Sequence, residues 1–229
     1  MEERIFECCE GIRYEVDLPD GYHFVEGSSE DGVVVEDSKG NQFVRVPSGY
    51  TAGGEYVRGF WLSRFEISVD SDGEPHSIAD RYPTVCLNFY EAEELAEKMG
   101  GALISGYEYN RICMWMVQSG SATFDEVFVE GKEIRDDPAN PYVLSKGGYD
   151  PSRMKNHIDN FFGGNWIWTT ERSELYDYYR IIRGGYGKAF YTQKCYPPVR
   201  RAWLDPEASG KVSIRVVIRD KKDEDDDED

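Results

Sequence analysis

Residues 83–118 read PTVCLNFYEAEELAEKMGGALISGYEYNRICMWMVQ and predict two helices, each with its own start signal. Asn88 and Glu91 have the spacing of a capping box, in which each side chain accepts a hydrogen bond from the other residue's backbone N–H. Ser105 and Glu108 repeat that spacing, and the pair of glycines between them ends the first helix. The second helix extends to the end of the quoted stretch. The first places its apolar residues on one face, as an amphipathic helix requires: Phe89, Ala92, Leu95, Ala96 and Met99.

Residues 12–68, upstream of the helices, predict strands joined by tight turns. They contain the runs YEVDL, HFVEG, VVVED, QFVRVP and FWLSRFEIS, which are rich in β-branched and aromatic residues. The segment Asp37–Asn41 separates two of these runs and is typical of a hairpin turn. Downstream, residues 119–164 contain many Gly, Pro and Asp residues, which is typical of long irregular segments. Short apolar runs predict further strands at residues 166–168, 180–183, 199–203 and 212–218.

The composition restricts the class of partner. The chain has 229 residues, of which 40% are hydrophobic, so it can bury the core of one large domain or two small ones. It carries 44 acidic and 26 basic residues, for a net charge of −18. That charge repels nucleic acid and anionic lipid, because binding to either depends on Lys and Arg. No stretch approaches the about 20 apolar residues of a spanning helix. We therefore expect no nucleic-acid partner and no membrane insertion.

The last ten residues, DKKDEDDDED at 220–229, hold eight acids and two lysines and so contribute −6 of the net charge. A block of like charges without apolar residues cannot bury surface, and it predicts a disordered, solvated tail. An acidic docking segment for a basic partner is the alternative.

The cellular compartment is indicated by the N-terminus and the cysteines. MEERIFECCEGIRYEV has acids where a signal peptide needs a basic start and an apolar run. The cysteines are odd in number and form no CxxC pair, which favours reduced thiols over a disulfide framework or a zinc site. They are Cys8, Cys9, Cys86, Cys113 and Cys195. We expect synthesis in the cytoplasm without a signal peptide.

Motifs for enzymatic chemistry are missing from the sequence, which has no GxSxG elbow, no P-loop and no GxGxxG turn. His23, His76 and His157 are scattered without metal-ligand spacing, and surface positions explain them better. Asp136-Asp137 and Asp159-Asn160 could hold calcium through oxygen ligands, with solvated loop residues as the alternative, since they lack EF-hand spacing. Calcium is the metal that the sequence leaves open.

Seven blocks of sequence follow one another in an order that resembles a known family. They are FVRVPSGY (43–50), GFWLSRFEIS (59–68), YPTVCLNFYEAEELAEKMGG (82–101), ALISGYEYN (102–110), GGNWIWTTERS (163–173), RIIRGGYG (180–187) and RRAWLDPEASGKVSIRVVI (200–218). Their succession resembles the formylglycine-generating-enzyme-like (sulfatase-modifying-factor) branch of the C-type lectin fold. Trp166 and Trp168 match the paired tryptophans of that family, and Arg183-Gly184-Gly185 matches its RGG motif.

The resemblance implies an α+β fold of the C-type lectin-like, formylglycine-generating-enzyme type, with two helices, short antiparallel sheets and long loops. The implied domain spans residues 42–219. Residues 1–41 add a β-rich N-terminal extension, and residues 220–229 form the disordered acidic tail. Trp166 and Trp168 share one strand face, which favours a core role for both.

The copper chemistry of the resembled enzymes is not preserved in the sequence. Those enzymes bind copper through two cysteines just after the RGG motif, whereas this chain has Cys195 alone in that segment. One thiolate cannot form the two-sulfur site that Cu(I) prefers. Ile167 also stands where the family has a glutamate between its tryptophans. We therefore expect neither enzymatic activity nor a bound cofactor. The alternative is a copper-dependent oxidase of the formylglycine-generating type, with Cys195 as its remaining thiol.

The C-terminal third is rich in tyrosine and tryptophan, which are common contact residues in binding surfaces. In the order of its WxW, RGG and terminal-strand blocks, the chain also resembles the variable proteins of diversity-generating retroelements. That resemblance implies a non-catalytic surface that recognises a protein or glycan ligand, in the setting of viral or phage receptor binding and virion association. The implied contact residues are Tyr186, Lys188, Phe190, Tyr191, Gln193, Lys194, Tyr196, Trp203, Leu204 and Asp205.

A third interpretation is a structural subunit of a virion or homo-oligomer, in which the same aromatic residues form an assembly interface. Burial of these residues in a stable oligomer favours this interpretation, and exposure on one face of the free chain favours ligand binding. The sequence leaves open the ligand, the oligomeric state, any bound metal, diversification of the C-terminal region and the source organism.

Overall fold

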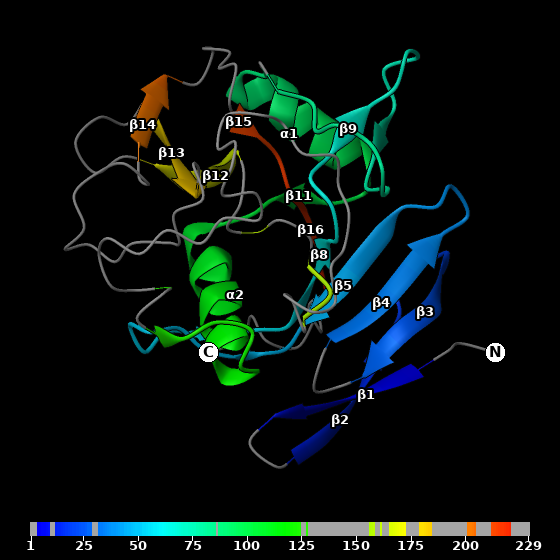
Figure 1. Cartoon of the computed structure of the whole chain (residues 1–229), viewed down its shortest axis with the longest axis vertical. Helices are drawn as coiled ribbons and strands as arrows, with labels where there is room; N and C mark the ends of the chain where they lie inside the picture. Colours follow the sequence, from blue (N-terminus) through cyan, green and yellow to red (C-terminus); the bar gives the residue numbers. More distant parts are fainter. Residues whose placement is uncertain are drawn as a thin grey trace, which may run out of the picture.

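The computed structural model describes residues 4–9, 12–28, 32–85, 87–124, 127, 156–158, 161, 165–172, 179–184, 201–204 and 212–220. In this part of the chain, two helices accompany mostly antiparallel strands, which confirms the predicted α+β class (Figure 1). The helices are α1 (Phe89–Lys98) and α2 (Gly106–Gln118). The strands are β1 (Arg4–Cys9), β2 (Ile12–Asp17), β3 (Tyr22–Ser28), β4 (Gly32–Asp37), β5 (Gln42–Val46), β6 (Gly49–Tyr50), β7 (Tyr56–Val57), β8 (Phe60–Ser63), β9 (Ser68–Val69), β10 (Pro75–His76), β11 (Ala102–Leu103), β12 (Trp166–Arg172), β13 (Tyr179–Gly184), β14 (Arg201–Leu204), β15 (Val212–Ser213) and β16 (Val216–Arg219).

The largest sheet has six strands in the order β11-β16-β8-β5-β4-β3, and every neighbouring pair is antiparallel. Strand β16, near the end of the chain, lies between β11 and β8, so distant parts of the sequence meet in this sheet. The predicted hairpin turn connects β4 to β5. Its first residue, Asp37, accepts hydrogen bonds from the backbone N–H groups of Lys39 (2.8 Å) and Asn41 (2.9 Å). These side-chain bonds explain why this stretch forms a turn.

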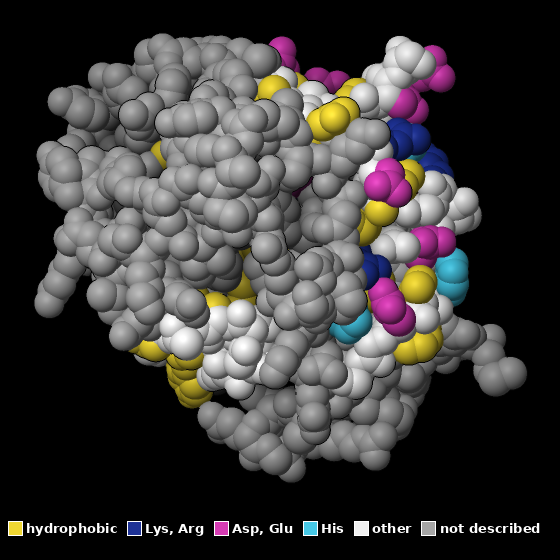
Figure 2. All heavy atoms as spheres, viewed as in Figure 1, with side chains coloured by type: hydrophobic (Ala, Val, Ile, Leu, Met, Phe, Trp, Pro, Cys, Tyr) yellow, Lys and Arg dark blue, Asp and Glu magenta, His cyan; other side chains and the backbone are white. Residues whose placement is uncertain are grey.

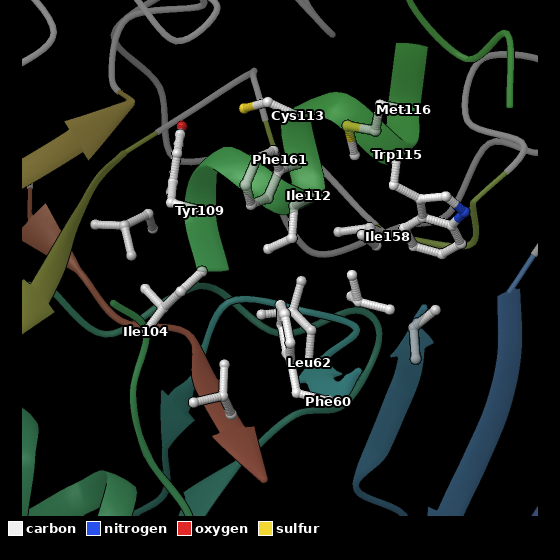
Figure 3. Close-up of a cluster of buried hydrophobic side chains, with 14 of the residues drawn as sticks. Phe60, Leu62, Ile104, Tyr109, Ile112, Cys113, Trp115, Met116, Ile158 and Phe161 are labelled. Carbon is white, nitrogen blue, oxygen red and sulfur yellow. The ribbon is translucent and has the colours of Figure 1, made fainter. Parts of the chain in front are cut away.

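Strands β4, β5, β8 and β16 of the six-stranded sheet contribute residues to two buried cores, one shared with α2 and one shared with α1, whereas the edge strand β3 is largely exposed. Val34 and Leu62 pack in the core on the α2 side, whereas Val33 and Val35 pack on the α1 side. Neighbouring residues of a strand point to opposite faces, so the continuous apolar run 33–35 supplies both cores. Figure 3 shows the α2 side, where Leu62 lies opposite helix residues such as Ile112.

Both helices begin at the predicted caps. The Asn88 side chain accepts a hydrogen bond from the backbone N–H of Glu91 (3.0 Å), and the Glu91 carboxylate accepts one from the N–H of Asn88 (2.8 Å). Ser105 and Glu108 form the same reciprocal pair at 3.2 and 2.8 Å. Neither of these helices, the two in the described part of the chain, is long and apolar enough to span a membrane.

A second sheet has four strands in the order β14-β13-β12-β15, and it contains the paired tryptophans. Trp166 and Trp168 of β12 are buried in the core on the α1 side, which confirms their predicted core role. The small two-stranded sheets are the hairpins β1–β2, β6–β7 and β9–β10. Strands β13 and β14 of this sheet flank residues 185–200, where most of the predicted contact residues lie.

Replacement of Gly32 by alanine is expected to lower the free energy of unfolding by about 1–3 kcal/mol. Alanine is strained at positive φ, and its Cβ would also press against the Trp115 ring, so the loss should exceed that at a glycine with positive φ alone. Gly32 begins β4 with φ +94°, and a Cβ there would lie 2.7 Å from a ring atom of Trp115 on α2. Urea unfolding measures the loss. Gly21→Ala is the matched control, since Gly21 has φ +83° but a Cβ there would meet no other atom within 4 Å. Equal losses in the two variants would show that the Trp115 contact has no effect.

Candidate ligand-binding site

The predicted contact residues lie in and around the connection from β13 to β14. Trp203 and Leu204 are on β14, where they pair with Arg180 and Tyr179 of β13. The other predicted residues lie outside the part of the chain that the structure describes: Tyr186, Lys188, Phe190, Tyr191, Gln193, Lys194, Tyr196 and Asp205. Their contact role stays a prediction. Residues 185–200 join the two strands. The described residues therefore include β13 and β14, the strands that support this site.

Arg180 holds β13 against helix α1. Its side chain is buried, and its guanidinium lies over the ring of Phe89 on α1, 4.4 Å from the ring centre. Phe89 makes an edge-to-face contact with Trp168 of β12, with 6.0 Å between the ring centres. The indole N–H of Trp168 donates a hydrogen bond to the carbonyl of Leu87 at 3.0 Å. Cation–π and aromatic contacts therefore join both strands to the first turn of α1.

Arg183 holds the end of β13 from which residues 185–200 depart. Its guanidinium donates two hydrogen bonds to the Glu171 carboxylate of β12, from Nε at 2.9 Å and from Nη2 at 2.6 Å. A further bond from Nη1 reaches the side chain of Asn110 on α2 at 3.2 Å. Gly106 at the start of α2 lies so close that a Cβ there would be 2.5 Å from the Glu171 carboxylate. Charge-assisted hydrogen bonds thus connect two strands and a helix at this point.

Glu66 joins the starts of β12 and β15. Its buried carboxylate accepts hydrogen bonds from the side chains of Asn165 (2.8 Å) and Ser213 (2.5 Å). Asn165 directly precedes β12, and Ser213 lies on β15. Trp166 pairs with Gly184, so the connection from β13 to β14 begins at this same end of the sheet. The hydrogen bonds offset part of the cost of burying a carboxylate.

Sequence reasoning identified some of these anchors without their partners. Glu66 and Arg183 fall in blocks that resemble the family, but their polar partners were not predicted. Asn110 is 73 residues from Arg183, and Asn165 is 99 residues from Glu66. The available signal was a charged residue within an otherwise apolar strand, as in RIIR at 180–183, because a buried charge needs a partner.

The last described residues are held by two ion pairs. Arg219 donates to the Glu108 carboxylate of α2 at 2.6 and 2.9 Å. Asp220 accepts two hydrogen bonds of 2.8 Å from the buried Arg45 of β5. The first residue of the predicted acidic tail is therefore bound to the six-stranded sheet. Residues 221–229 lie outside the described part of the chain.

Of the cysteines and predicted metal ligands, Cys113 is the residue whose side chain the structure describes. Cys113 of α2 is buried, and this burial raises the pKa of its thiol far above the ordinary value. A protonated, buried thiol is a poor nucleophile and a poor metal ligand. Where side chains are described, no group of three His, Cys, Asp or Glu residues could hold a metal ion. Cys195 and the predicted calcium ligands Asp136, Asp137, Asp159 and Asn160 fall outside the described ranges.

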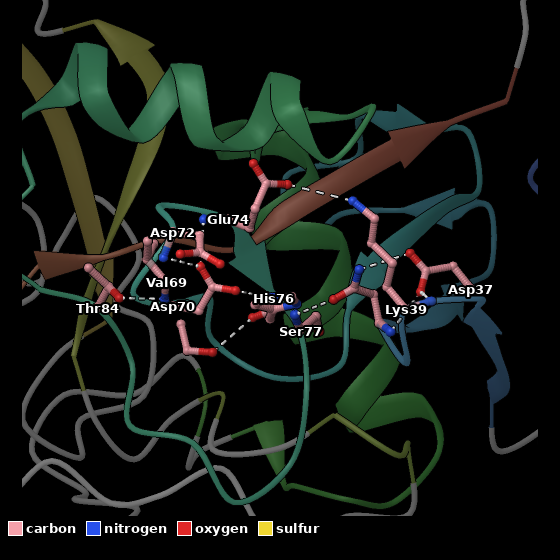
Figure 4. A network of polar contacts seen from close by, with 11 residues as sticks. Asp37, Lys39, Val69, Asp70, Asp72, Glu74, His76, Ser77 and Thr84 are labelled. Atoms are coloured by element: carbon pink, nitrogen blue, oxygen red, sulfur yellow. Dashed lines mark hydrogen bonds and ion pairs between the residues drawn. The ribbon is translucent and has the colours of Figure 1, made fainter.

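Asp70 organises the hairpin of β9 and β10 (Figure 4). Its carboxylate accepts hydrogen bonds from the backbone N–H groups of Asp72 and Glu74, both at 2.9 Å, and lies 2.9 Å from Nε2 of His76. The contact with His76 is the main cause that lowers the pKa of Asp70 to about 2. Of the three histidines predicted at the surface, His23 is exposed, whereas the side chains of His157 and His76 are only 14% and 12% exposed, so the prediction is wrong for these two. The contact with Asp70 explains why His76 is not at the surface.

Acidification is expected to weaken this hairpin. Folding lowers the pKa of Asp70 below its ordinary value of 3.8, so the contribution of its charge to stability is fully present above about pH 5 and is lost as the pH falls through about 2. Asp70→Asn keeps a side-chain acceptor and removes the charge. The stability difference between the two proteins is therefore expected to shrink between about pH 5 and about pH 2. Urea unfolding at several pH values measures it, and a constant difference would contradict the expectation.

The two helices, the six-stranded antiparallel sheet and the smaller four-stranded sheet form an α+β fold of the C-type lectin-like class. Among solved structures, PvdO from Pseudomonas aeruginosa is similar with a TM-score of 0.50 and 17% identity, over 80% of this chain and 97% of that chain. The I1 and P3c variants of Major Tropism Determinant each give a TM-score of 0.42, with 15% and 14% identity, over 93% of this chain and 70% of theirs. No protein-family model matches the sequence, and the comparison with curated proteins gives no match. The likeness to PvdO shows the fold alone.

Proposed function

We propose that the chain is a non-catalytic ligand-binding protein that displays a variable-protein-type surface and recognises a protein or a glycan. The proposed contacts are the aromatic and polar residues predicted between Tyr186 and Tyr196, together with Trp203, Leu204 and Asp205. Receptor binding by a virus or phage is the setting that the sequence resemblance implies.

The observation that carries this proposal is the anchoring of the strands on both sides of residues 185–200. On one side, Arg183 is bound to Glu171 and Asn110. On the other side, β14 pairs with β13 along its whole length, from Arg201 to Leu204. Binding residues are commonly placed on connections that a rigid scaffold positions, because a fixed scaffold reduces the entropy lost on binding.

The chemistry of the predicted residues supports the same function. Tyrosine and tryptophan supply large, rigid contact area, and they are enriched where binding energy is concentrated. Lys188, Gln193 and Lys194 add hydrogen-bond donors among them. This combination suits recognition of a polar protein surface or a glycan.

The test is a binding screen with the full chain, fluorescently labelled, on a glycan array and on a panel of intact bacterial cells. The combined variant Tyr186→Ser, Tyr191→Ser and Tyr196→Ser is expected to lose about tenfold or more in affinity for any probe that binds, as loss of central aromatic contacts does. Size-exclusion chromatography with light scattering on the same sample gives the oligomeric state. A stable oligomer that loses its assembly in this variant would favour the structural-subunit interpretation instead.

The matched control removes exposed apolar side chains from another part of the molecule. Phe24 and Val25 of β3 are 45% and 39% exposed, and Figure 1 shows β3 at the opposite side of the fold from β12–β14. The double variant Phe24→Ser and Val25→Ser is expected to bind like the unmodified chain. Equal losses in the tyrosine and control variants, or no bound probe at all, would argue against the proposal.

A further inference from the structure

A second surface carries a pair of exposed tyrosines on the hairpin β6–β7. Tyr50 and Tyr56 pair directly across the hairpin. Their side chains are 52% and 56% exposed, their ring centres are 5.4 Å apart, and the ring planes meet at 67°. Among the residues described, no other two side chains that are both more than half exposed have their rings in contact.

This surface is distinct from the proposed ligand-binding site. The hairpin lies beside α2, at the end away from the four-stranded sheet (Figure 1). In the same view, Figure 2 shows exposed hydrophobic side chains at the lower left of the molecule. Arg111, which holds the start of the hairpin, also donates a hydrogen bond to Gln118 at the end of α2 (3.0 Å). The four-stranded sheet contacts the start of the same helix, at Gly106 and Asn110.

The hairpin holds the two rings in a fixed arrangement. At its tip, the backbone N–H of Thr51 donates to the carbonyl of Glu55 (2.9 Å), and the Thr51 hydroxyl donates to the Glu55 carboxylate. At its base, the buried Arg111 donates to the carbonyls of Pro47 (2.9 Å) and Ser48 (3.2 Å). A ligand therefore meets rings that are already in place, and little conformational entropy is lost when it binds.

The electrostatics of the hairpin and of the chain favour a positively charged ligand. The face of an aromatic ring is negative and attracts a cation within about 6 Å of the ring centre, and two rings at a steep angle can present two such faces to one compact cation. Glu55 precedes Tyr56, and hydrogen bonds from Thr51 and from its own backbone N–H lower the pKa of its carboxyl, which keeps it charged. The net charge of −18 adds long-range attraction for cations.

We propose that Tyr50 and Tyr56 form a weak binding site for an organic cation, namely an alkylammonium or guanidinium group such as the Lys and Arg side chains of a basic protein partner carry. Anions are repelled by the ring faces and by the charge of the chain. The site uses residues separate from the proposed ligand contacts, so the two proposals stand or fail independently.

The test uses the full chain labelled with 3-fluorotyrosine, whose fluorine NMR signals report on each ring. Tetramethylammonium chloride is the probe, with sodium chloride at equal ionic strength as the salt control and tert-butanol as a neutral molecule of similar shape. We expect tetramethylammonium alone to shift the signals of Tyr50 and Tyr56 in a saturable manner. Tyr50→Phe and Tyr56→Phe assign those signals. A titration with N-acetylarginine methylamide then shows whether an arginine side chain binds as the quaternary ammonium does.

Removal of one ring tests whether both rings contribute to binding of the cation. Tyr50→Leu keeps an apolar side chain, and it is expected to raise the dissociation constant of tetramethylammonium measured at Tyr56 about two- to fivefold. Tyr107, a tyrosine of α2 that is 60% exposed, is the internal control whose signal should not saturate. Equal shifts with tert-butanol would identify an ordinary apolar patch and overturn the proposal. A lack of saturation at Tyr50 and Tyr56, or an unchanged dissociation constant in Tyr50→Leu, would also overturn the proposal.

Discussion

Replacement of Trp168 by alanine is expected to lower the free energy of unfolding by about 3–5 kcal/mol. The Trp168 side chain has no exposed surface, packs edge-to-face on Phe89 and donates its indole N–H to the carbonyl of Leu87. Alanine leaves a cavity between α1 and the four-stranded sheet, together with a partly buried carbonyl that has lost its donor. Urea unfolding followed by circular dichroism measures the change.

Two control variants separate the parts of this effect. Trp168→Phe keeps an aromatic ring beside Phe89 but removes the donor to Leu87, so a smaller loss of about 1–3 kcal/mol is expected. Phe24→Ala removes an exposed ring from β3 and should change stability by about 0.5 kcal/mol or less. A loss in Trp168→Ala no larger than that in Phe24→Ala would disprove the role of Trp168 in joining α1 to the sheet.

Replacement of Arg215 by methionine is expected to lower the free energy of unfolding by about 2–5 kcal/mol, because each buried carbonyl that loses its donor costs about 1–3 kcal/mol. Arg215 is fully buried between β15 and β16, where the chain passes from the four-stranded sheet to the six-stranded sheet. Its Nη1 donates to the carbonyls of Ser63 (3.0 Å) and Arg64 (3.1 Å) at the end of β8. Methionine fills much of the same volume but cannot donate.

The measurement is again urea unfolding, with Lys98→Met as the matched control. Lys98 lies at the surface, 3.6 Å from Glu94 in an i,i+4 ion pair, so its loss should cost only about 0.3–0.5 kcal/mol. A neutral or stabilising effect of Arg215→Met would mean that the cost of burying the guanidinium exceeds the gain from its hydrogen bonds. In that case Arg215 would not be a stabilising connection between the two sheets.

The local elements of this fold were predictable because their causes lie within a few residues. The Asn88–Glu91 and Ser105–Glu108 capping boxes depend on side chains three positions apart, and both formed as predicted. The turn that begins at Asp37 likewise depends on bonds to backbone groups two and four residues away. For the same reason, the helix boundaries agree with the prediction to within one residue.

Periodicity predicted less where a strand is buried on both faces. The run Val33-Val34-Val35 indicated a strand but could not show which residue meets which helix, since all three positions are apolar. His76 was assigned to the surface because the sequence does not show that the hairpin brings it against Asp70. The order of the six strands, with β16 between β11 and β8, depends on pairing between segments far apart in the chain.

By itself, the sequence determined the two helices and their caps, the strand segments, the core role of Trp166 and Trp168, and the class of the fold. Only the tertiary structure decided which polar groups support the candidate site. Arg183 has its partners at Glu171 and Asn110, Glu66 has Asn165 and Ser213, and the carbonyl partners of Arg215 lie more than 150 residues away. Such contacts form only after distant segments have been brought together, and burial then makes each pairing necessary, because an unpaired charge away from water is costly.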